Sequence, residues 1–133
     1  MLRKLEDILD KNTPILEVKD YININANKFL DIINDFITKN NYKIREKSSD
    51  YIIINIPGKT LINNLNLKKL SGHNLDKYNN VKSKIRCNIQ NKNSIEIISY
   101  EHILCLENEK IIFLEILENR LKIFKNFIEQ NLK

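Results

Sequence analysis

The last stretch of the chain has the hydrophobic pattern of one long amphipathic helix. Between Asn108 and Lys133 there is no glycine or proline, and apolar residues recur at steps of three and four, which aligns side chains along one side of a helix. That side is made of Phe113, Leu117, Leu121, Phe124 and Ile128, widened by Ile112, Leu114, Ile116 and Ile123. Charged residues fill much of the remainder, namely Glu115, Glu118, Lys122, Lys125 and Glu129. At about 1.5 Å per residue the helix spans roughly 35–39 Å, so a broad apolar surface has to cover it.

A strand that leads straight into a second helix is predicted near the N-terminus. From Ile15 to Ile24 apolar and polar residues alternate, as in a half-buried strand, although Asp20 interrupts the apolar side and marks a bulge or a kink. Asn25 is a suitable N-cap, and Asn40 and Asn41 can end the helix because asparagine tolerates left-handed geometry. The apolar side of the strand is Leu16, Val18, Ile22 and Ile24, and that of the helix is Ala26, Phe29, Leu30, Ile33, Phe36 and Ile37. Residues 2–11 have the pattern of a short additional helix.

A first hairpin is predicted from residues 42–47 and 51–56, which flank a polar loop at 48–50. A two-residue loop would place Lys43 and Arg45 beside the isoleucines of the second strand. Because a one-residue slip turns every side chain to the other face, burial favours a three-residue loop. The cross-strand pairs are then Lys47 with Tyr51, Glu46 with Ile52, and Ile44 with Ile54. The apolar face becomes Ile44, Ile52, Ile54 and Ile56.

A second hairpin is predicted around a loop at 91–93, which pairs Cys87 with Ile97. Alternation puts Val81, Ser83, Ile85, Cys87 and Ile89 on one face and Lys82, Lys84, Arg86 and Asn88 on the other. Residues 57–80 open with the turn signal Pro57-Gly58, and the stretch that follows fits a strand or part of a short helix before a polar loop. Residues 99–106 either continue the preceding strand or form one more.

The predicted order is strand, helix, an antiparallel run of four to six strands, and one long helix. An antiparallel sheet with one apolar face buries that face under helices. The sequence therefore predicts the α+β class, with residues 1–133 forming a single domain in which an antiparallel sheet wraps around the long C-terminal helix.

Residues 17–36, EVKDYININANKFLDIINDF, resemble the opening strand and helix of the START-like superfamily, also known as polyketide-cyclase/Bet v 1 or SRPBCC, whose fold is called a helix grip. The resemblance rests on the strand that runs straight into the helix, on Phe29 near the start of that helix, on Asp35-Phe36 at its end, and on the similarly placed final helix. Such domains commonly have six strands after the first helical region. Only four are clear here, which leaves the size of any pocket open.

The resemblance implies a cavity for a lipid, sterol, polyketide or similar apolar molecule between the sheet and the final helix. Most small-molecule sites are largely apolar concavities with few polar anchors. The residues expected to line this cavity are Val18, Ile44, Ile54, Ile85, Cys87, Ile97, Leu117, Leu121 and Phe124. The alternative is that the same residues fill a solid core.

The basic residues of the two hairpins indicate a second function. The net charge of +5 permits attraction to phosphates without requiring it. Readers of single strands usually interleave aromatic side chains for stacking, and Tyr100 and Tyr21 are the ones predicted on the outer face, where Glu17 and Glu96 dilute the charge. The basic residues of that face are Lys43, Arg45, Lys47, Lys82, Lys84 and Arg86. A nucleic-acid-binding or protein-interaction module is thus the alternative function, and a merely solvated face is the remaining interpretation.

No catalytic or metal-binding motif is recognisable, so neither an enzyme nor a cofactor is predicted. His102, Cys105 and Cys87 supply three candidate ligands, whereas structural zinc takes four, and two cysteines are too few for a disulfide framework. No run approaches the roughly 20 apolar residues that cross a bilayer. The first residues are too charged for a signal peptide, so a cytoplasmic location is expected. The sequence gives no oligomeric state.

Overall fold

The computed structural model describes residues 15–57, 81–90 and 93–132 of the chain. Its elements are β1 (Ile15–Ile22), α2 (Ala26–Asn40), β2 (Lys43–Lys47), β3 (Tyr51–Ile56), β4 (Ser83–Asn88), β5 (Ile95–His102) and α4 (Glu107–Gln130). The predictions for residues 2–11 and for the stretch after Pro57 lie outside the described residues.

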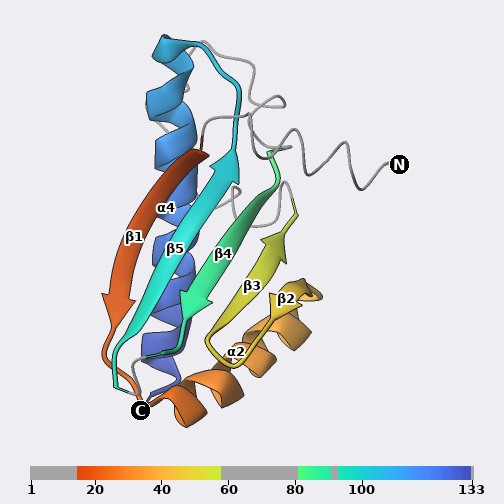
Figure 1. Cartoon of the computed structure of the whole chain (residues 1–133), viewed down its shortest axis with the longest axis vertical. Helices are drawn as coiled ribbons and strands as arrows, with labels where there is room; N and C mark the ends of the chain where they lie inside the picture. The colour runs from red at the N-terminus through yellow and green to blue at the C-terminus, as the bar shows by residue number, and fades with distance from the viewer. Residues whose placement is uncertain (1–14, 58–80, 91–92, 133) are drawn as a thin grey trace.

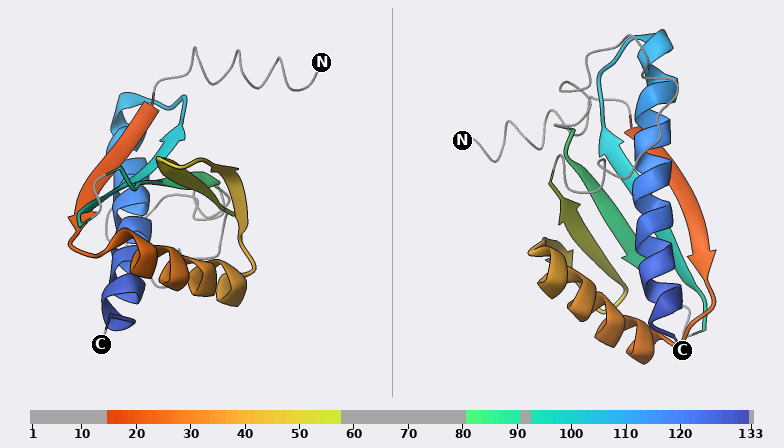
Figure 2. Two further views of the ribbon diagram at one scale, coloured as in Figure 1. Left: turned by 60° about the horizontal axis from the view of Figure 1, so that its bottom comes forward. Right: turned by 180° about the vertical axis from the view of Figure 1, so that it is seen from behind.

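Five antiparallel strands form one sheet in the order β1-β5-β4-β3-β2 (Figure 1). The first strand therefore pairs with the last, and α2 links the two opposite edges. Both helices lie on the same face of the sheet, with α4 packed along β1 and β5 (Figure 2). The predicted α+β class, with an antiparallel sheet against a long C-terminal helix, is confirmed. No helix in the described ranges is long and apolar enough to span a bilayer.

The ends of α2 are set by asparagines, as predicted. The side chain of Asn25 accepts a hydrogen bond from the Asn27 N–H at 2.9 Å, which satisfies one of the open donors of the first turn. Asn41 ends the helix with φ at 55°, a left-handed geometry that asparagine adopts at modest cost. These local contacts fix where the chain leaves β1 and where it enters β2.

Helix α4 begins and ends within three residues of the predicted bounds. Its acidic first turn, with Glu107 and Glu109, complements the positive end of the helix dipole. The Leu106 N–H also donates to the Glu109 carboxylate at 3.4 Å. The buried side of the helix is Ile112, Phe113, Ile116, Leu117, Arg120, Leu121, Phe124 and Ile128, so the predicted apolar side faces the sheet but includes one arginine.

The first hairpin departs from its predicted register. Ile44 does pair with Ile54, but a bulge at Arg45 brings Glu46 opposite Ile53 and Lys47 opposite Ile52. The predicted pairs of Lys47 with Tyr51 and of Glu46 with Ile52 are therefore wrong. Edge strands accept bulges readily, and β2 is an edge strand whose residues are all exposed. Burial of side chains therefore does not stabilise the regular register of this strand.

The second hairpin and the first strand follow the predicted alternation. Cys87 pairs with Ile97, and β5 continues to His102 without a further strand between it and α4. No bulge forms at Asp20, which stays in register opposite Ile97. Its carboxylate instead forms an ion pair with Lys125 of α4 at 3.0 Å. Asp20, which interrupts the apolar side of the strand, thus connects the sheet to the helix.

The buried apolar side chains form two clusters along α4. The larger one joins Leu121, Phe124 and Ile128 of α4 to α2 and to the inner face of β3, β4 and β5. The smaller one joins Ile112, Phe113, Ile116 and Leu117 to Leu16 of β1. Arg120 lies between the two groups in the sequence of the helix, so the core changes character at that point.

Candidate functional site

The apolar residues expected to line a ligand cavity lie mostly in the core. Seven of the nine are almost completely buried in the two clusters, namely Ile54, Ile85, Cys87, Ile97, Leu117, Leu121 and Phe124. Val18 is partly buried against them, whereas Ile44 is 40% exposed on the edge strand. Two cavities open at the surface, with volumes of about 650 and 390 Å³, and other residues line both.

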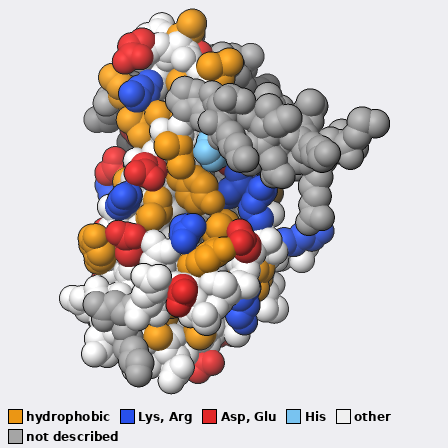
Figure 3. All heavy atoms as spheres, in the orientation of Figure 1, with side chains coloured by type: hydrophobic (Ala, Val, Ile, Leu, Met, Phe, Trp, Pro, Cys, Tyr) orange, Lys and Arg blue, Asp and Glu red, His pale blue; other side chains and the backbone are white. Residues whose placement is uncertain are grey.

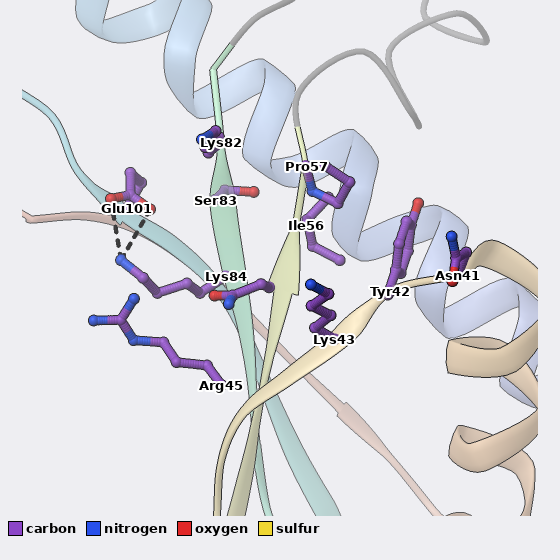
Figure 4. Close-up of a pocket in the computed structure, with 11 residues that line it drawn as sticks. Asn41, Tyr42, Lys43, Arg45, Ile56, Pro57, Lys82, Ser83, Lys84 and Glu101 are labelled. Atoms are coloured by element: carbon purple, nitrogen blue, oxygen red, sulfur yellow. Dashed lines mark hydrogen bonds and ion pairs between the residues drawn. The ribbon is translucent and has the colours of Figure 1, made fainter.

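Four of the six predicted basic residues meet around the larger cavity. Lys43, Arg45, Lys82 and Lys84 line it, at the end of the sheet where β2 begins, β3 ends and β4 begins (Figure 4). We call this cavity the basic hollow. Its remaining described lining residues are Asn41, Tyr42, Asn55, Ile56, Pro57, Ser83 and Glu101. Four cationic side chains and one carboxylate therefore surround a volume that is typical of small-molecule sites.

The other two basic residues are placed elsewhere. The Arg86 guanidinium lies over the Tyr51 ring, 4.1 Å from its centre, on the outer face of the sheet. Lys47 is opposite Ile52 because of the bulge, and directly paired residues share a face. Lys47 therefore shares the face of Ile52 on the edge strand, away from the other five basic residues. The basic stripe expected from regular alternation is in fact a cluster of four residues around the hollow, with Arg86 farther along the outer face and Lys47 on the edge strand.

The single carboxylate of the basic hollow is already bound. Both carboxylate oxygens of Glu101 accept hydrogen bonds from the Lys84 Nζ at 3.1 Å, and Lys84 is only 8% exposed. The Lys84 Nζ also lies 5.7 Å from the centre of the Tyr100 ring. Lys84 is therefore a buried, ordered wall of the hollow, whereas Lys43, Arg45 and Lys82 are exposed cations at its rim.

A buried arginine lies directly behind the lining of the hollow. Arg120 of α4 is fully buried, and its Nη1 donates to the Ser83 Oγ at 2.7 Å. The Nε and Nη2 groups of the same guanidinium are buried without a hydrogen-bond partner in the described part of the chain. Burial lowers the pKa of Arg120 to about 10, while Tyr42 and Glu101, both lining residues, act in the opposite direction. At neutral pH the group is therefore a cation inside the protein.

Sequence reasoning missed Arg120, although a signal was present. Arg120 follows Phe113 by seven residues and Leu117 by three, the spacing that defines the apolar side of α4. A charged residue at such a position is seldom buried without a partner. Ser83 was assigned correctly to the inner face, but without a reason for a hydroxyl there. The hydrogen bond between the two residues supplies that reason.

The outer face of the sheet shows Lys and Arg side chains among hydrophobic ones (Figure 3), and two of these cations lie over the rings of Tyr51 and Tyr100. Tyr51, whose hydroxyl donates to Glu46, belongs to this face. The predicted alternation of the strand already implied this position, but the ring was not counted among the aromatic residues of the face. Burial raises the pKa of the Tyr100 hydroxyl, which reflects a ring half covered by its neighbours. Ile53 and Ile98 also lie on this face, 5% and 9% exposed. The face is thus partly apolar, with charged groups above it.

Metal chemistry finds no support in the described ranges, which contain no group of three or more His, Cys, Asp or Glu side chains that could hold an ion. Cys87 is buried and Cys105 is partly buried, and both are free thiols. Comparison with family models, curated proteins and solved structures finds no match to this chain. The function must therefore be argued from the geometry and charge of the site.

Proposed function

We propose that the protein binds single-stranded nucleic acid across the outer face of the sheet, with phosphates of the strand held at the basic hollow. The observation that carries the proposal is the gathering of Lys43, Arg45, Lys82 and Lys84 around one cavity, with the ring of Tyr100 beside Lys84 and that of Tyr51 farther along the same face beneath Arg86. These residues come from two parts of the chain, β2 and the start of β4, which the order β4-β3-β2 brings to the same end of the sheet.

The charge of the hollow fits a polyanion. Glu101, the one carboxylate among its described lining residues, is neutralised by Lys84, and the exposed side chains of Lys43, Arg45 and Lys82 carry positive charge at the rim. Lysine and arginine side chains that neutralise phosphates release condensed counterions, and this release drives binding that does not depend on base sequence. The rim therefore supplies the electrostatic part of an affinity for nucleic acid.

The outer face adds surfaces on which bases can stack. Aromatic rings and arginine guanidinium planes bind unpaired bases of any sequence, and this face presents Tyr100 beside Lys84 and Tyr51 beneath Arg86. Double-stranded nucleic acid keeps its bases stacked inside the helix and does not use such surfaces. The combination of rings and cations therefore favours a single strand.

The resemblance to the START-like superfamily supports a different proposal, that a small apolar molecule binds between the sheet and α4. Its support is the order of elements, since the structure has the strand, the helix, the antiparallel strands and the long final helix of a helix grip. Nothing in the packing of the described residues favours it specifically. It stays a prediction, and the Cys87 variant described in the Discussion tests it.

The nucleic-acid proposal is tested by fluorescence anisotropy with labelled single-stranded RNA and DNA over a range of salt concentrations. Replacing Lys43, Arg45 and Lys82 together by glutamine removes three rim charges and leaves the buried Lys84 in place. We expect weaker binding to every sequence, and a plot of log affinity against log salt that is shallower by about 2, since each phosphate contact to a single strand contributes about 0.7.

The matched control replaces Lys28, Lys110 and Lys122 by glutamine, which removes the same charge from exposed positions on the two helices. This variant should keep the affinity and salt dependence of the parent. Equal losses in both variants would mean that net charge alone attracts the strand. Absence of binding by the parent at about 50 mM salt would reject the proposal. The basic face would then be interpreted either as a protein-interaction surface or as a merely solvated face.

A further inference from the structure

Two nitrogens of the Arg120 guanidinium, which carry three N–H donors, have no hydrogen-bond partner in the described residues. Its Nη1 is used by Ser83, while Nε and Nη2 are buried with no partner in the described ranges. A buried polar group without a hydrogen bond is costly, more so when it is charged. Such groups in a native structure call for an explanation, and an anion or water that completes the site is one of them.

Ser83 connects this charge to the basic hollow. Its Oγ accepts the hydrogen bond from Arg120 Nη1, and the residue itself lines the hollow. Because an oxygen lone pair is committed to Arg120, the hydroxyl proton remains to be donated elsewhere. A cation behind the hydroxyl makes that proton a better donor to a negative oxygen. The floor of the hollow thus offers a polarised O–H group with a buried positive charge behind it.

The charges around this floor suit a doubly charged group. Lys43 and Lys82 are exposed lining residues of the hollow (Figure 4), Arg120 is buried behind Ser83, and Glu101 is engaged by Lys84. A carboxylate or an internal phosphodiester carries one negative charge. A phosphate monoester carries about −1.5 to −2 at neutral pH and offers three acceptor oxygens. The excess of positive charge and of donors favours the monoester.

We infer that the basic hollow is a binding site for a phosphate monoester, whose oxygens accept from the Ser83 hydroxyl and are held by the charges of Arg120, Lys43 and Lys82. Two sources share this chemistry, namely the terminal phosphate of a nucleic acid strand and a free mononucleotide. The first source rests on the proposed function, whereas the second does not.

The test compares ligands that differ only in the monoester. Affinities are measured for one short oligonucleotide with a 5′-phosphate, with a 3′-phosphate and with hydroxyls at both ends, and for adenosine 5′-monophosphate against adenosine. We expect a phosphorylated form to bind about tenfold more tightly than its hydroxyl counterpart, which corresponds to one charge-assisted hydrogen bond. Adenosine 5′-monophosphate tests the site even if no oligonucleotide binds. Failure of the proposed function is therefore distinguished from failure of this inference.

Two variants connect the preference to the floor of the hollow. Ser83→Ala removes the donor and Arg120→Met removes the charge. In each variant the affinity for the phosphorylated ligand should be no more than about twice the affinity for its hydroxyl counterpart. Ser99→Ala is the matched control, because Ser99 is also fully buried in the sheet and its Oγ has no hydrogen-bond partner in the described residues. This variant should keep the preference of the parent.

The same variants separate a binding role from a structural one. Replacing a buried charge by an apolar side chain of similar size is often neutral or stabilising, so Arg120→Met should keep its melting temperature while the preference is lost. If Arg120→Met does not fold, Ser83→Ala and Ser99→Ala decide. The inference is overturned if the parent binds phosphorylated and hydroxyl forms equally in both ligand series, or if Ser83→Ala keeps the full preference.

Discussion

The two faces of the sheet follow the same alternation of residues but depart from it in opposite ways. The inner face is a nearly continuous layer of isoleucine side chains against the helices, broken by Ser83, by Ser99 and by Arg120 of the facing helix. The outer face is charged, yet it holds Ile53 and Ile98 almost fully buried. The Ser83–Arg120 pair inside is costly unless something else is gained, whereas the two isoleucines outside are stabilised because neighbouring side chains cover them.

The places where these departures occur are informative. Ser83 begins β4, and its hydrogen bond to Arg120 brings a positive charge to the end of the sheet that carries the basic hollow. The apolar part of the outer face adjoins the rings of Tyr51 and Tyr100. Local sequence preferences usually agree with the fold, and departures from this agreement are expected at functional sites. The comparison therefore directs attention to the end of the sheet that carries the basic hollow and to the middle of its outer face, and experiments on each face can separate packing from binding.

The largest effect is expected on the inner face, from Leu121→Ala. Leu121 is 3% exposed in the larger core cluster, and large-to-small changes at such positions cost about 2–5 kcal/mol of unfolding free energy because they leave a cavity. Denaturation by urea measures the loss. Leu104→Ala is the control, since Leu104 is 85% exposed and should change stability little. An unchanged midpoint for Leu121→Ala would mean that the apolar side of α4 serves another surface, such as an oligomer interface.

Much of the inner face could be predicted because its determinants are local or strongly driven by burial. The caps of α2 at Asn25 and Asn41 depend on side chains within a few residues of the helix ends. The pairing of Cys87 with Ile97 was correct because both neighbouring strands are buried on that face, and a slip would expose a row of isoleucines. Where burial is strong, the sequence is compatible with a single pairing register of the strands.

The outer face and the candidate site were harder to predict for the same physical reason. Strand β2 gains little from burial, so the bulge at Arg45 cost little, and it moved Lys47 and Glu46 away from their predicted partners. The convergence of Lys43 and Lys82 depends on pairing between strands far apart in the sequence. The contact of Arg120 with Ser83 joins residues 37 positions apart, which no local pattern specifies.

An intermediate effect is expected from Cys87→Phe, which tests whether the inner face is solid. Cys87 is fully buried between isoleucines, and inserting a ring into a filled core costs about 1–3 kcal/mol. A cavity for an apolar ligand at this position would accept the ring with little loss and would lose its ligand. Thermal stability and binding of a fluorescent apolar probe are measured for the variant and the parent. We expect clear destabilisation and no probe bound by the parent. Probe binding that the substitution abolishes at unchanged stability would instead establish the ligand site.

The smallest effect is expected from Asp20→Asn, at a polar position of the inner face that lies at the edge of the sheet. The Lys125 ammonium donates a hydrogen bond to the Asp20 carboxylate and lowers its pKa below the ordinary 3.8, with help from the Tyr21 N–H. A carboxyl whose pKa is lower in the folded state stabilises the protein above the unfolded value. That contribution is lost as the pH falls through the folded value.

The Asp20 side chain is 45% exposed, so solvent screening limits the ion pair to roughly 0.2–1 kcal/mol. Asp20→Asn should therefore lose this small amount at pH 7 and become as stable as the parent when the pH falls well below 3.8. Asp31→Asn, at an exposed position of α2, is the control for general charge effects. A loss for Asp20→Asn that does not change with pH would mean that the amide disturbs packing instead of removing an ion pair. A loss well above 1 kcal/mol would mean that solvent screens this ion pair less than the exposure of Asp20 indicates.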